Sequence, residues 1–396
     1  MTTTAWQIAV VGAGPVGLAL ALHASRLLPH AQVTVFDARP ADRDVSADPR
    51  TLALSLGSVQ FLQQLGAWPA AAAEPITEVH VSQMPPSWGT AFGPAEVQLK
   101  AADLHVPQLG AVLSYGALLA PLQRAWETSV AAQPQRLHSR FGTPVAAIKP
   151  LPDGVEVDAD IAERFDLAVV AEGGVFADQA RKAMVSDYRQ TAWVGTVTLQ
   201  GATRGCAFER FTRHGPAALL PLPAAADGMA RAALVWCVPS ADDPVQALDD
   251  QQRLAVLRTI FPAAAGQLVA ITPLKSFALG LNAERTLVQG RTVRIGNAAQ
   301  TLHPVAGQGL NLGLRDAHEL VSALRWQPDM DRALQRVEWA RAGDRWSTIA
   351  TTDFLARSFT WKLPGAATAR GLGLAALQAV PPLKGWLARR MMFGQR

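Results

Sequence analysis

Apolar and polar residues at the start of the chain follow a pattern that predicts a strand, a helix and a second strand. Residues 7–12 form a short apolar, β-branched run, which a glycine-rich turn joins to a helix-compatible stretch ending near Pro29. A second apolar run, at 32–37, closes on an acidic residue. Because a strand, a helix and a parallel strand form the βαβ unit, we expect a parallel sheet in this part of the chain.

The pattern then changes between two kinds of sheet. Alternation at 78–83 and a stretch rich in Gly, Pro and β formers at 90–115 predict an antiparallel insertion, after which helical periodicity returns at 116–132. The run 167–171 is apolar at every position, which indicates a strand covered on both faces and a return to the parallel sheet. Residues 191–239 contain strand-like runs separated by Gly, Pro and Asp, and predict a second antiparallel block.

A further strand and helix are expected towards the C-terminal end. The run 291–297 predicts a strand, and it leads into a helix with apolar residues at helical spacing on one face. The β-rich blocks alternate with the parallel sheet along the chain, so the domains are expected to be interleaved rather than consecutive. The apolar helix positions are Leu310, Leu314, Ala317, Val321 and Leu324.

A GxGxxG motif lies between the first predicted strand and helix. Its three glycines allow a tight turn, let the backbone approach a pyrophosphate and let the helix pack closely on the strand. An aspartate ends the second strand, where its carboxylate accepts hydrogen bonds from adenosine ribose hydroxyls. Together these features predict dinucleotide binding. The expected contacts are Gly12, Gly14, Val16, Gly17, Asp37 and Ala38.

A second glycine motif indicates which dinucleotide is bound. Gly307 and Gly309 bracket the start of the amphipathic helix, so that free backbone N–H groups form another anion site there. A reduced flavin carries negative charge on its pyrimidine side, which a helix N-terminus stabilises. Two helix N-termini, one for the pyrophosphate and one for the ring, predict FAD rather than NAD.

These motifs resemble those of the class A flavoprotein monooxygenases of the para-hydroxybenzoate hydroxylase fold, and within them the ubiquinone-biosynthesis aromatic hydroxylases. The resemblance covers nearly the whole chain. It is carried by residues 12–22, 48–68, 208–222 and 296–317, of which the last segment is highly specific. It implies that FAD is the bound cofactor and that NAD(P)H reduces it.

The resemblance also implies roles for individual residues. Gly296 and Asn297 match a pair that reaches the flavin ribityl chain, where Asn keeps an acceptor for a hydroxyl. Pro304 and the backbone after it border the isoalloxazine, and Arg50 matches an arginine on the phosphate–ribitol region of the cofactor. The implied flavin contacts are Arg50, Gly296, Asn297, Pro304, Gly307, Gln308, Gly309 and Leu310.

His303 is the candidate catalytic residue, because it precedes Pro304 and a proton relay beside the ring would help to form a phenolate. The alternative is a local hydrogen-bonding element in the turn. The chain departs from the family at two positions. Glu172, before Gly173 and Gly174, stands where relatives have the Asp of an Asp-Gly pair, and Gln300 stands where many have His.

The expected fold is therefore α/β, with a Rossmann-like FAD-binding domain interleaved with a β-sheet substrate domain, and with a C-terminal helical region. The FAD-binding domain is discontinuous. The predicted boundaries are 1–75, 116–185 and 285–330 for the FAD-binding domain, 76–115 and 186–284 for the β-rich substrate domain, and 331–396 for the basic, apolar C-terminal region.

The activity implied by the resemblance is hydroxylation of the aromatic ring of a polyprenylated phenol in ubiquinone biosynthesis. Dioxygen is the co-substrate, and oxygen transfer proceeds through a flavin hydroperoxide in a dry, apolar pocket. Two alternatives stay open. One is a hydroxylase of a small soluble aromatic acid, and the other is a non-catalytic flavin-binding scaffold subunit of a quinone-biosynthesis complex, which the departure at Glu172 keeps in view.

Composition excludes several other classes of protein. Of the residues, 49% are hydrophobic and 17% are charged, against about 25% charged in an average globular protein, which favours a large core over disorder. Two cysteines, Cys206 and Cys237, cannot form a disulfide framework, and their surroundings in the sequence do not suggest a metal site. The N-terminus shows no export signal, so we expect a cytoplasmic protein. We also expect no nucleic-acid partner.

Positive charge is concentrated at the C-terminal end. The formal net charge is +4, but after Asp353 there are seven Lys and Arg residues and no acidic residue, which leaves −3 for residues 1–353. The apolar segment 371–387 is shorter than the roughly 20 residues that span a bilayer, and Pro381 and Pro382 interrupt it. Two interpretations stay open: a helix packed over the substrate domain, or a peripheral contact with anionic lipid at the inner face of the membrane or with an accessory protein.

Overall fold

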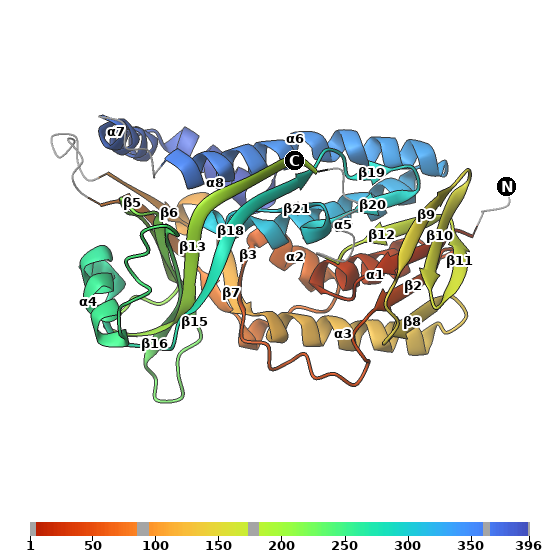
Figure 1. Ribbon diagram of the computed structural model, residues 1–396, viewed down its shortest axis with the longest axis horizontal. Coiled ribbons are helices and arrows are strands. Elements are labelled where there is room, and N and C mark those ends of the chain that lie inside the picture. Colours follow the sequence, from red (N-terminus) through yellow and green to blue (C-terminus); the bar gives the residue numbers. More distant parts are fainter. Residues whose placement is uncertain (1–4, 85–94, 173–181, 359–364, 395–396) are drawn as a thin grey trace.

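The computed structural model describes residues 5–84, 95–172, 182–358 and 365–394. A mostly parallel sheet lies at one end of the elongated molecule and a large, mostly antiparallel sheet at the other (Figure 1). The long helix α6 (Met330–Ser358) runs along one side between these two ends, and α3 (Tyr115–Ala132) runs along the opposite side (Figure 1). The architecture is the α/β fold that the sequence predicts.

The parallel sheet has six strands in the order β19-β20-β12-β1-β2-β8. Alternate residues of β1 divide the core between its two faces: Ile8 and Val10 pack on the helical side, whereas Ala9 and Val11 pack on a separate three-stranded sheet. Helices α1, α3 and α5 cover the first face, and the sheet β9-β10-β11 covers the second. The run 167–171 indeed contributes a central parallel strand, β12, between β1 and β20.

The elements of this part have the following bounds. The strands of the six-stranded sheet are β1 (Gln7–Val11), β2 (Gln32–Asp37), β8 (Leu137–Phe141), β12 (Leu167–Val170), β19 (Val288–Gln289) and β20 (Thr292–Arg294). The covering elements are α1 (Pro15–Leu27), α5 (Gln308–Trp326), β9 (Ala147–Leu151), β10 (Gly154–Ala159) and β11 (Ile161–Phe165). A smaller sheet, β3-β7-β4, consists of β3 (Thr51–Ser55), β7 (Gly110–Ser114) and β4 (Glu74–Ile76), with α2 (Leu56–Gln64) directly after β3.

The large sheet has nine strands, and α4 (Asp250–Ile260) covers its outer face. The strands within each predicted block pair antiparallel, and the two blocks join through one parallel pair, β5 with β14. These two strands come from segments far apart in the sequence, so no hairpin constrains their direction. The strands are β5 (Glu78–Gln83), β6 (Glu96–Lys100), β13 (Lys182–Gln200), β14 (Cys206–Phe211), β15 (Pro216–Leu222), β16 (Ala230–Pro239), β17 (Gln267–Ile271), β18 (Lys275–Glu284) and β21 (Gln300–Thr301).

Two helices, α7 (Ala366–Ala379) and α8 (Pro381–Phe393), follow α6. Leu374 of α7 and Met392 of α8 belong to the cluster that also contains Val97 of β6, so these helices pack onto the body of the protein. In the described ranges, no helix combines the length and apolar character needed to cross a membrane. Short 3-10 turns lie between these elements: η1 (Ala70–Ala72), η3 (Ala102–Leu104), η5 (Ala263–Ala265), η6 (Gly296–Ala298) and η7 (Val305–Gly307).

Candidate active site

The three glycines of the first motif differ in what surrounds them. Gly12 has a φ of +103° and packs against Glu172, and a Cβ on Gly17 would lie 1.9 Å from the carbonyl oxygen of Gly12. A Cβ on Gly14 would instead make only an ordinary contact, 3.6 Å from the hydroxyl of Tyr115. Gly12 and Gly17 thus serve the turn and the packing, whereas Gly14 leaves the backbone open to a ligand.

The start of α1 has the features of an anion site. Gly14 is the N-cap, no side chain caps the helix, and the first turn contains no acidic residue. Val16 and Gly17 therefore carry backbone N–H groups without an intrahelical partner, at the positive end of the helix dipole. This arrangement fits the pyrophosphate of a dinucleotide.

Asp37 lies at the carboxyl end of β2 beside this turn. Its Oδ2 accepts a hydrogen bond from the N–H of Ala13 at 2.7 Å, and its Oδ1 accepts from the N–H and Nε of Arg39 at 2.8 and 2.9 Å. Burial opposes ionisation of Asp37, but the hydrogen bonds from Arg39 and Ala13 outweigh it and hold its pKa below the ordinary value. A ribose hydroxyl would share this carboxylate with Arg39, a residue that the sequence did not single out. The adjacent Ala38 is exposed.

Tyr115 connects Arg50 with the first glycine motif, because it contacts both. Its guanidinium stands 4.1 Å from the centre of the Tyr115 ring and forms an ion pair with Asp48 at 2.7 Å. The hydroxyl of the same tyrosine is the group that faces Gly14. Because the Arg50 side chain is 65% exposed, it is free to turn towards a bound phosphate.

The two glycine motifs meet at the carboxyl edge of the parallel sheet. Gly296 follows β20 with a φ of +59° and packs against Val16 of the first motif. Gly313 of α5 approaches both, since a Cβ there would lie 2.8 Å from the Cα of Gly296 and 2.9 Å from Cγ2 of Val16. Asn297 is exposed. The close approach of α1 and α5 therefore brings together sequence segments that are almost 300 residues apart.

The start of α5 has the same features as the start of α1. Gly307 is its N-cap with a φ of +58°, no side chain caps the helix, and no acidic residue lies in the first turn. A Cβ on Gly309 would meet nothing within 4 Å. Pro304 and Leu310 keep accessible surface beside this open position. The geometry fits a flat, negatively charged ring edge, which is the role predicted for these residues.

Gln308 and Asn311 hold this turn in place. Gln308 is buried and accepts a hydrogen bond from Arg315 at 3.3 Å. The Asn311 side chain, 2% exposed, accepts from the N–H of Ser55 at 2.8 Å and donates to the carbonyl oxygen of Gly307 at 2.8 Å. Asn311 was not predicted as a site residue, although an Asn among the apolar residues of a predicted helix is a signal for a buried polar contact.

His303 is buried, and both of its ring nitrogens have partners. Nδ1 accepts a hydrogen bond from the N–H of Val305 at 3.1 Å, so Nε2 carries the proton and donates to Oε1 of Gln190 at 3.2 Å. Burial lowers the pKa of His303 to about 4. Tyr188 packs edge-on against the imidazole at 5.1 Å. These contacts orient the loop that precedes α5, and the relay role stays a prediction.

Glu172 occupies the position after β12 where relatives have an aspartate. It is partly buried against Gly12, and burial together with the nearby Asp37 raises its pKa. Glu172 therefore belongs to the surroundings of the first motif. The two glycines that follow it, Gly173 and Gly174, lie outside the described residues.

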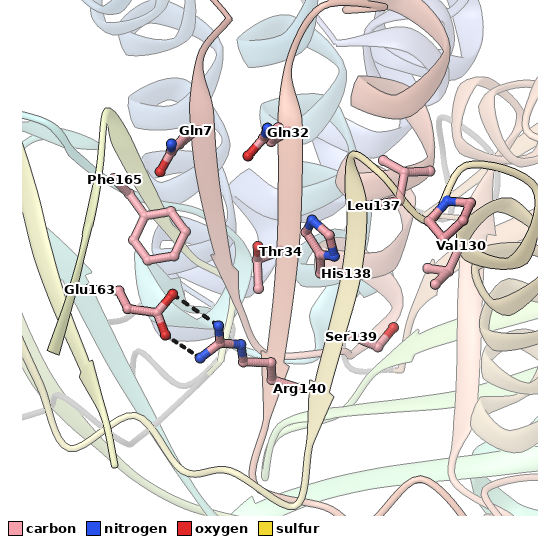
Figure 2. A pocket seen from close by; sticks show the side chains of 11 residues that line it. Gln7, Gln32, Thr34, Val130, Leu137, His138, Ser139, Arg140, Glu163 and Phe165 are labelled. Carbon is pink, nitrogen blue, oxygen red and sulfur yellow. Dashed lines mark hydrogen bonds and ion pairs between the residues drawn. The ribbon is translucent and has the colours of Figure 1, made fainter. Parts of the chain in front are cut away.

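A pocket of about 460 Å³ lies elsewhere, beside the amino-terminal ends of β1, β2 and β8 (Figure 2). Gln7, Gln32 and Phe165 line it, together with an ion pair between Arg140 and Glu163 (Figure 2). None of the predicted cofactor contacts lines this pocket. Across the described ranges, no three His, Cys, Asp or Glu side chains are arranged to hold a metal ion.

Comparisons with known proteins agree with this geometry. The family described as FAD binding domain matches residues 170–328. The 3-demethoxyubiquinol 3-hydroxylase of Escherichia coli is 30% identical over 407 residues, which cover 97% of each chain. The ubiquinone hydroxylase UbiL of Rhodospirillum rubrum is 38% identical over 212 residues, and this alignment spans 52% of the present chain and 48% of that protein.

Solved structures show the same fold. HpxO of Klebsiella pneumoniae, complexed with FAD and uric acid, superposes with a TM-score of 0.73 at 18% identity and covers 99% of this chain and 98% of its own. The p-nitrophenol 4-monooxygenase PnpA of Pseudomonas putida gives a TM-score of 0.75 at 16% identity, with both chains fully covered. With the full-length relative at 30% identity and two uncapped helix N-termini at one sheet edge, the chain belongs to the family of FAD-dependent ubiquinone-biosynthesis hydroxylases.

Proposed function

We propose that this protein hydroxylates the aromatic ring of a polyprenylated phenol in ubiquinone biosynthesis, using FAD, NAD(P)H and dioxygen. One observation carries the proposal: Gly14 and Gly309, at the starts of α1 and α5, are both open to a ligand at the edge where the two motifs meet. The alignment with an E. coli 3-demethoxyubiquinol 3-hydroxylase over 97% of both chains supports the same class of substrate.

The residues of this edge fit FAD. The N–H groups at the start of α1 would hold the pyrophosphate, Asp37 the ribose, and Gly307 to Leu310 the edge of the ring. The chemistry supplied by FAD when it is bound is the passage of two electrons from NAD(P)H to dioxygen. The protein's task is to position the phenol and to keep water away from it.

We propose that the nine-stranded sheet forms the substrate wall. Its inner face carries Val81 and Phe211, and Phe211 packs against Val305 in the turn that leads into α5. An apolar wall at this place would receive a prenylated ring and exclude water. This assignment corresponds to the predicted division into an FAD-binding part, a β-rich substrate part and a C-terminal helical part.

The test is turnover by the purified, FAD-loaded protein. We expect NAD(P)H oxidation to be stimulated by a short-chain prenylated phenol, with formation of a product that is heavier by one oxygen atom in mass spectrometry. Stimulation by 4-hydroxybenzoate alone would instead support a hydroxylase of a small soluble aromatic acid. A protein that binds FAD but responds to no phenol would be the scaffold subunit, and that result would overturn the proposal.

The C-terminal helices support a second, separate proposal, namely contact with anionic lipid at the inner face of the membrane. Leu383 and Trp386 of α8 are 49% and 55% exposed, and Leu372 of α7 is 42% exposed. The exposed Arg389 lies on the same helix as Trp386, and the chain contains no acidic residue after Asp353. Exposed apolar side chains beside cations are typical of helices that lie on anionic lipid.

Vesicle flotation tests this lipid contact. We expect the protein to float with phosphatidylglycerol vesicles but not with phosphatidylcholine vesicles, and a Lys384→Glu, Arg389→Glu variant to lose most of the binding. An Arg124→Glu, Arg336→Glu variant, with two charge reversals at exposed positions of α3 and α6, is the matched control and should bind like the wild type. Equal flotation of the α8 variant and the control would overturn the lipid contact and leave an accessory protein as the partner to seek.

A further inference from the structure

The side chain of Glu209, in β14, places a carboxyl group on the inner face of the nine-stranded sheet. Side chains alternate along β14: Cys206 and Phe208 pack in the cluster under α4 on the outer face, whereas Ala207 and Phe211 belong to clusters on the inner face. Residues separated by two positions share a face of a strand. Glu209 therefore lies on the inner face, between Ala207 and Phe211, and Figure 1 shows α4 on the far side of this sheet from α1 and α5.

This position is close to the turn that is predicted to border the flavin. Phe211 packs against Val305, the residue after Pro304. Glu209 precedes Phe211 by two residues, which corresponds to roughly 7 Å along a strand. In register beside Glu209 stand Val81 of β5 and Ala218 of β15. The carboxyl group thus belongs to an apolar wall next to the turn before α5.

Within the described ranges, no hydrogen bond or ion pair engages the Glu209 carboxyl, and the residue keeps some accessible surface. Burial raises its pKa to about 8. A strongly desolvated carboxyl without a protein partner costs free energy of folding, because it is either desolvated as an anion or held as an acid. Its presence is therefore better explained by a ligand than by the fold.

The surrounding titratable groups do not take this role from Glu209. Burial and the neighbouring Glu209 raise the pKa of the Cys237 thiol, so that group stays protonated at neutral pH. Arg370 of α7 is held by Gln83 and by the carbonyl oxygen of Ser358. Both ring nitrogens of His303 already have hydrogen-bond partners, in Gln190 and Val305. The side chains in register on β5 and β15 are apolar.

We propose that Glu209 exchanges a proton with the phenolic hydroxyl of the substrate. This inference rests on the proposed function. The O–H bond of the phenol breaks, the Glu209 carboxylate gains the proton and becomes a carboxylic acid, and the electron pair stays on oxygen as a phenolate. The ring is then more nucleophilic towards the incoming oxygen atom, and after hydroxylation the acid returns its proton to the product phenolate.

The acid strength of Glu209 fits this task. A general base works best when its pKa lies near the pH at which it acts, and such catalysis contributes about 10²–10⁴-fold. An ordinary glutamate, with a pKa of about 4.3, would be a much weaker base towards a phenol. The apolar wall that raises the pKa is the same wall that would receive the substrate ring.

The test compares Glu209→Gln, which keeps the shape and removes the carboxylate, with Glu209→Asp, which keeps the carboxylate. Glu156→Gln in β10, an ion-pair partner of Lys149 outside the site, is the matched control. FAD content and thermal midpoint show whether each variant is folded. The substrate is a short-chain prenylated phenol, followed by NAD(P)H oxidation and by the near-ultraviolet band of the bound phenol, which shifts on ionisation.

In the wild type, kcat/KM should rise about tenfold per pH unit up to about pH 8. Glu209→Gln should lower kcat/KM by about 100-fold at pH 8.5 and should lose both this pH dependence and the phenolate band, whereas Glu209→Asp and the control keep them. Survival of the pH dependence and the phenolate band in a folded Glu209→Gln protein would overturn this inference alone. Absence of wild-type turnover with the phenol would overturn the proposed function and this inference with it.

Discussion

Nε of Arg345, in α6, lies 2.7 Å from Oε1 of Gln300, in the short strand β21 between the two halves of the second motif. The amide of Gln300 donates in turn to the fully buried Asp316 of α5 at 3.3 Å. Arg345 also donates to the carbonyl oxygen of Glu284 at 2.5 Å. Helix α6, which follows the second motif, thus holds that motif through Arg345. Where many relatives have His, Gln300 uses both its amide oxygen and its amide nitrogen in hydrogen bonds.

Arg345→Met should therefore destabilise the FAD site. The guanidinium is 1% exposed, and its removal leaves the Gln300 and Glu284 oxygens without their donor. Each unsatisfied buried group costs about 1–3 kcal/mol, so we expect the free energy of unfolding in urea to fall by about 3 kcal/mol and FAD to be lost more readily. Arg336→Met, at an exposed position of the same helix, is the control and should change neither quantity.

The glycines of the first motif should separate folding from cofactor binding. Gly17→Ala places a Cβ 1.9 Å from the carbonyl oxygen of Gly12, so we expect a loss of about 1–3 kcal/mol in the free energy of unfolding. Gly14→Ala meets nothing closer than 3.6 Å at an ordinary φ of −76°, and should fold normally but bind FAD at least tenfold more weakly. Unchanged FAD affinity of Gly14→Ala in a fluorescence titration would contradict the pyrophosphate assignment.

The positions of both glycine motifs were predictable because glycine spacing and the strand–helix pattern are local features. The packing of Gly313 onto Gly296 and Val16 then follows from close approach of α1 and α5, which no local pattern specifies. The parallel pairing of β5 with β14 could not be predicted for the same reason, since strand neighbours from distant segments leave no periodic signal.

Individual polar residues of the site were harder to predict than the motifs. Arg39 follows the strand-ending Asp37 by two positions, and nothing in the sequence distinguishes it from an ordinary surface arginine. Its side chain nevertheless forms the main side-chain contact of the Asp37 carboxylate. Glu209 lies in the family-like segment 208–222, but no local pattern marks it as a site residue, because its position depends on which face of β14 turns inward. That choice is made by the sheet as a whole and by the helix α4 that covers its other face.

Stability should decline in mild acid because of His303. Its folded pKa of about 4 lies below the unfolded value of 6.5, so the unfolded state binds a proton first and stability is lost as the pH falls below 6.5. Between pH 6.5 and 5 the loss from this residue is about 2 kcal/mol. His23 acts in the same direction, because burial and the nearby His318 lower its pKa to about 4.

Urea unfolding at pH 7.5 and 5.0 measures this effect. The difference between the two pH values should be about 2 kcal/mol smaller in His303→Gln than in the wild type. The exposed His30→Gln is the control and should leave the difference unchanged. An equal pH dependence in His303→Gln and wild type would show that the imidazole is not held neutral by its surroundings, and would favour a solvent-linked relay.

Arg50 should matter for cofactor affinity and little for folding. Its ion pair with Asp48 is exposed, and such pairs contribute about 0–1 kcal/mol to stability. A charge-assisted hydrogen bond to a phosphate is stronger, at about 1.5–3 kcal/mol, so Arg50→Met should weaken FAD binding by at least tenfold while the urea midpoint barely moves. Arg124→Met, on the exposed face of α3, controls for loss of positive charge.

Tyr115 stands between Arg50 and Gly14. Tyr115→Phe keeps the ring under the guanidinium and should retain most of the FAD affinity. Tyr115→Ala removes the ring and should reproduce the loss seen in Arg50→Met. Wild-type FAD affinity in Arg50→Met would show that the guanidinium remains with Asp48 in the loaded protein and would remove Arg50 from the site.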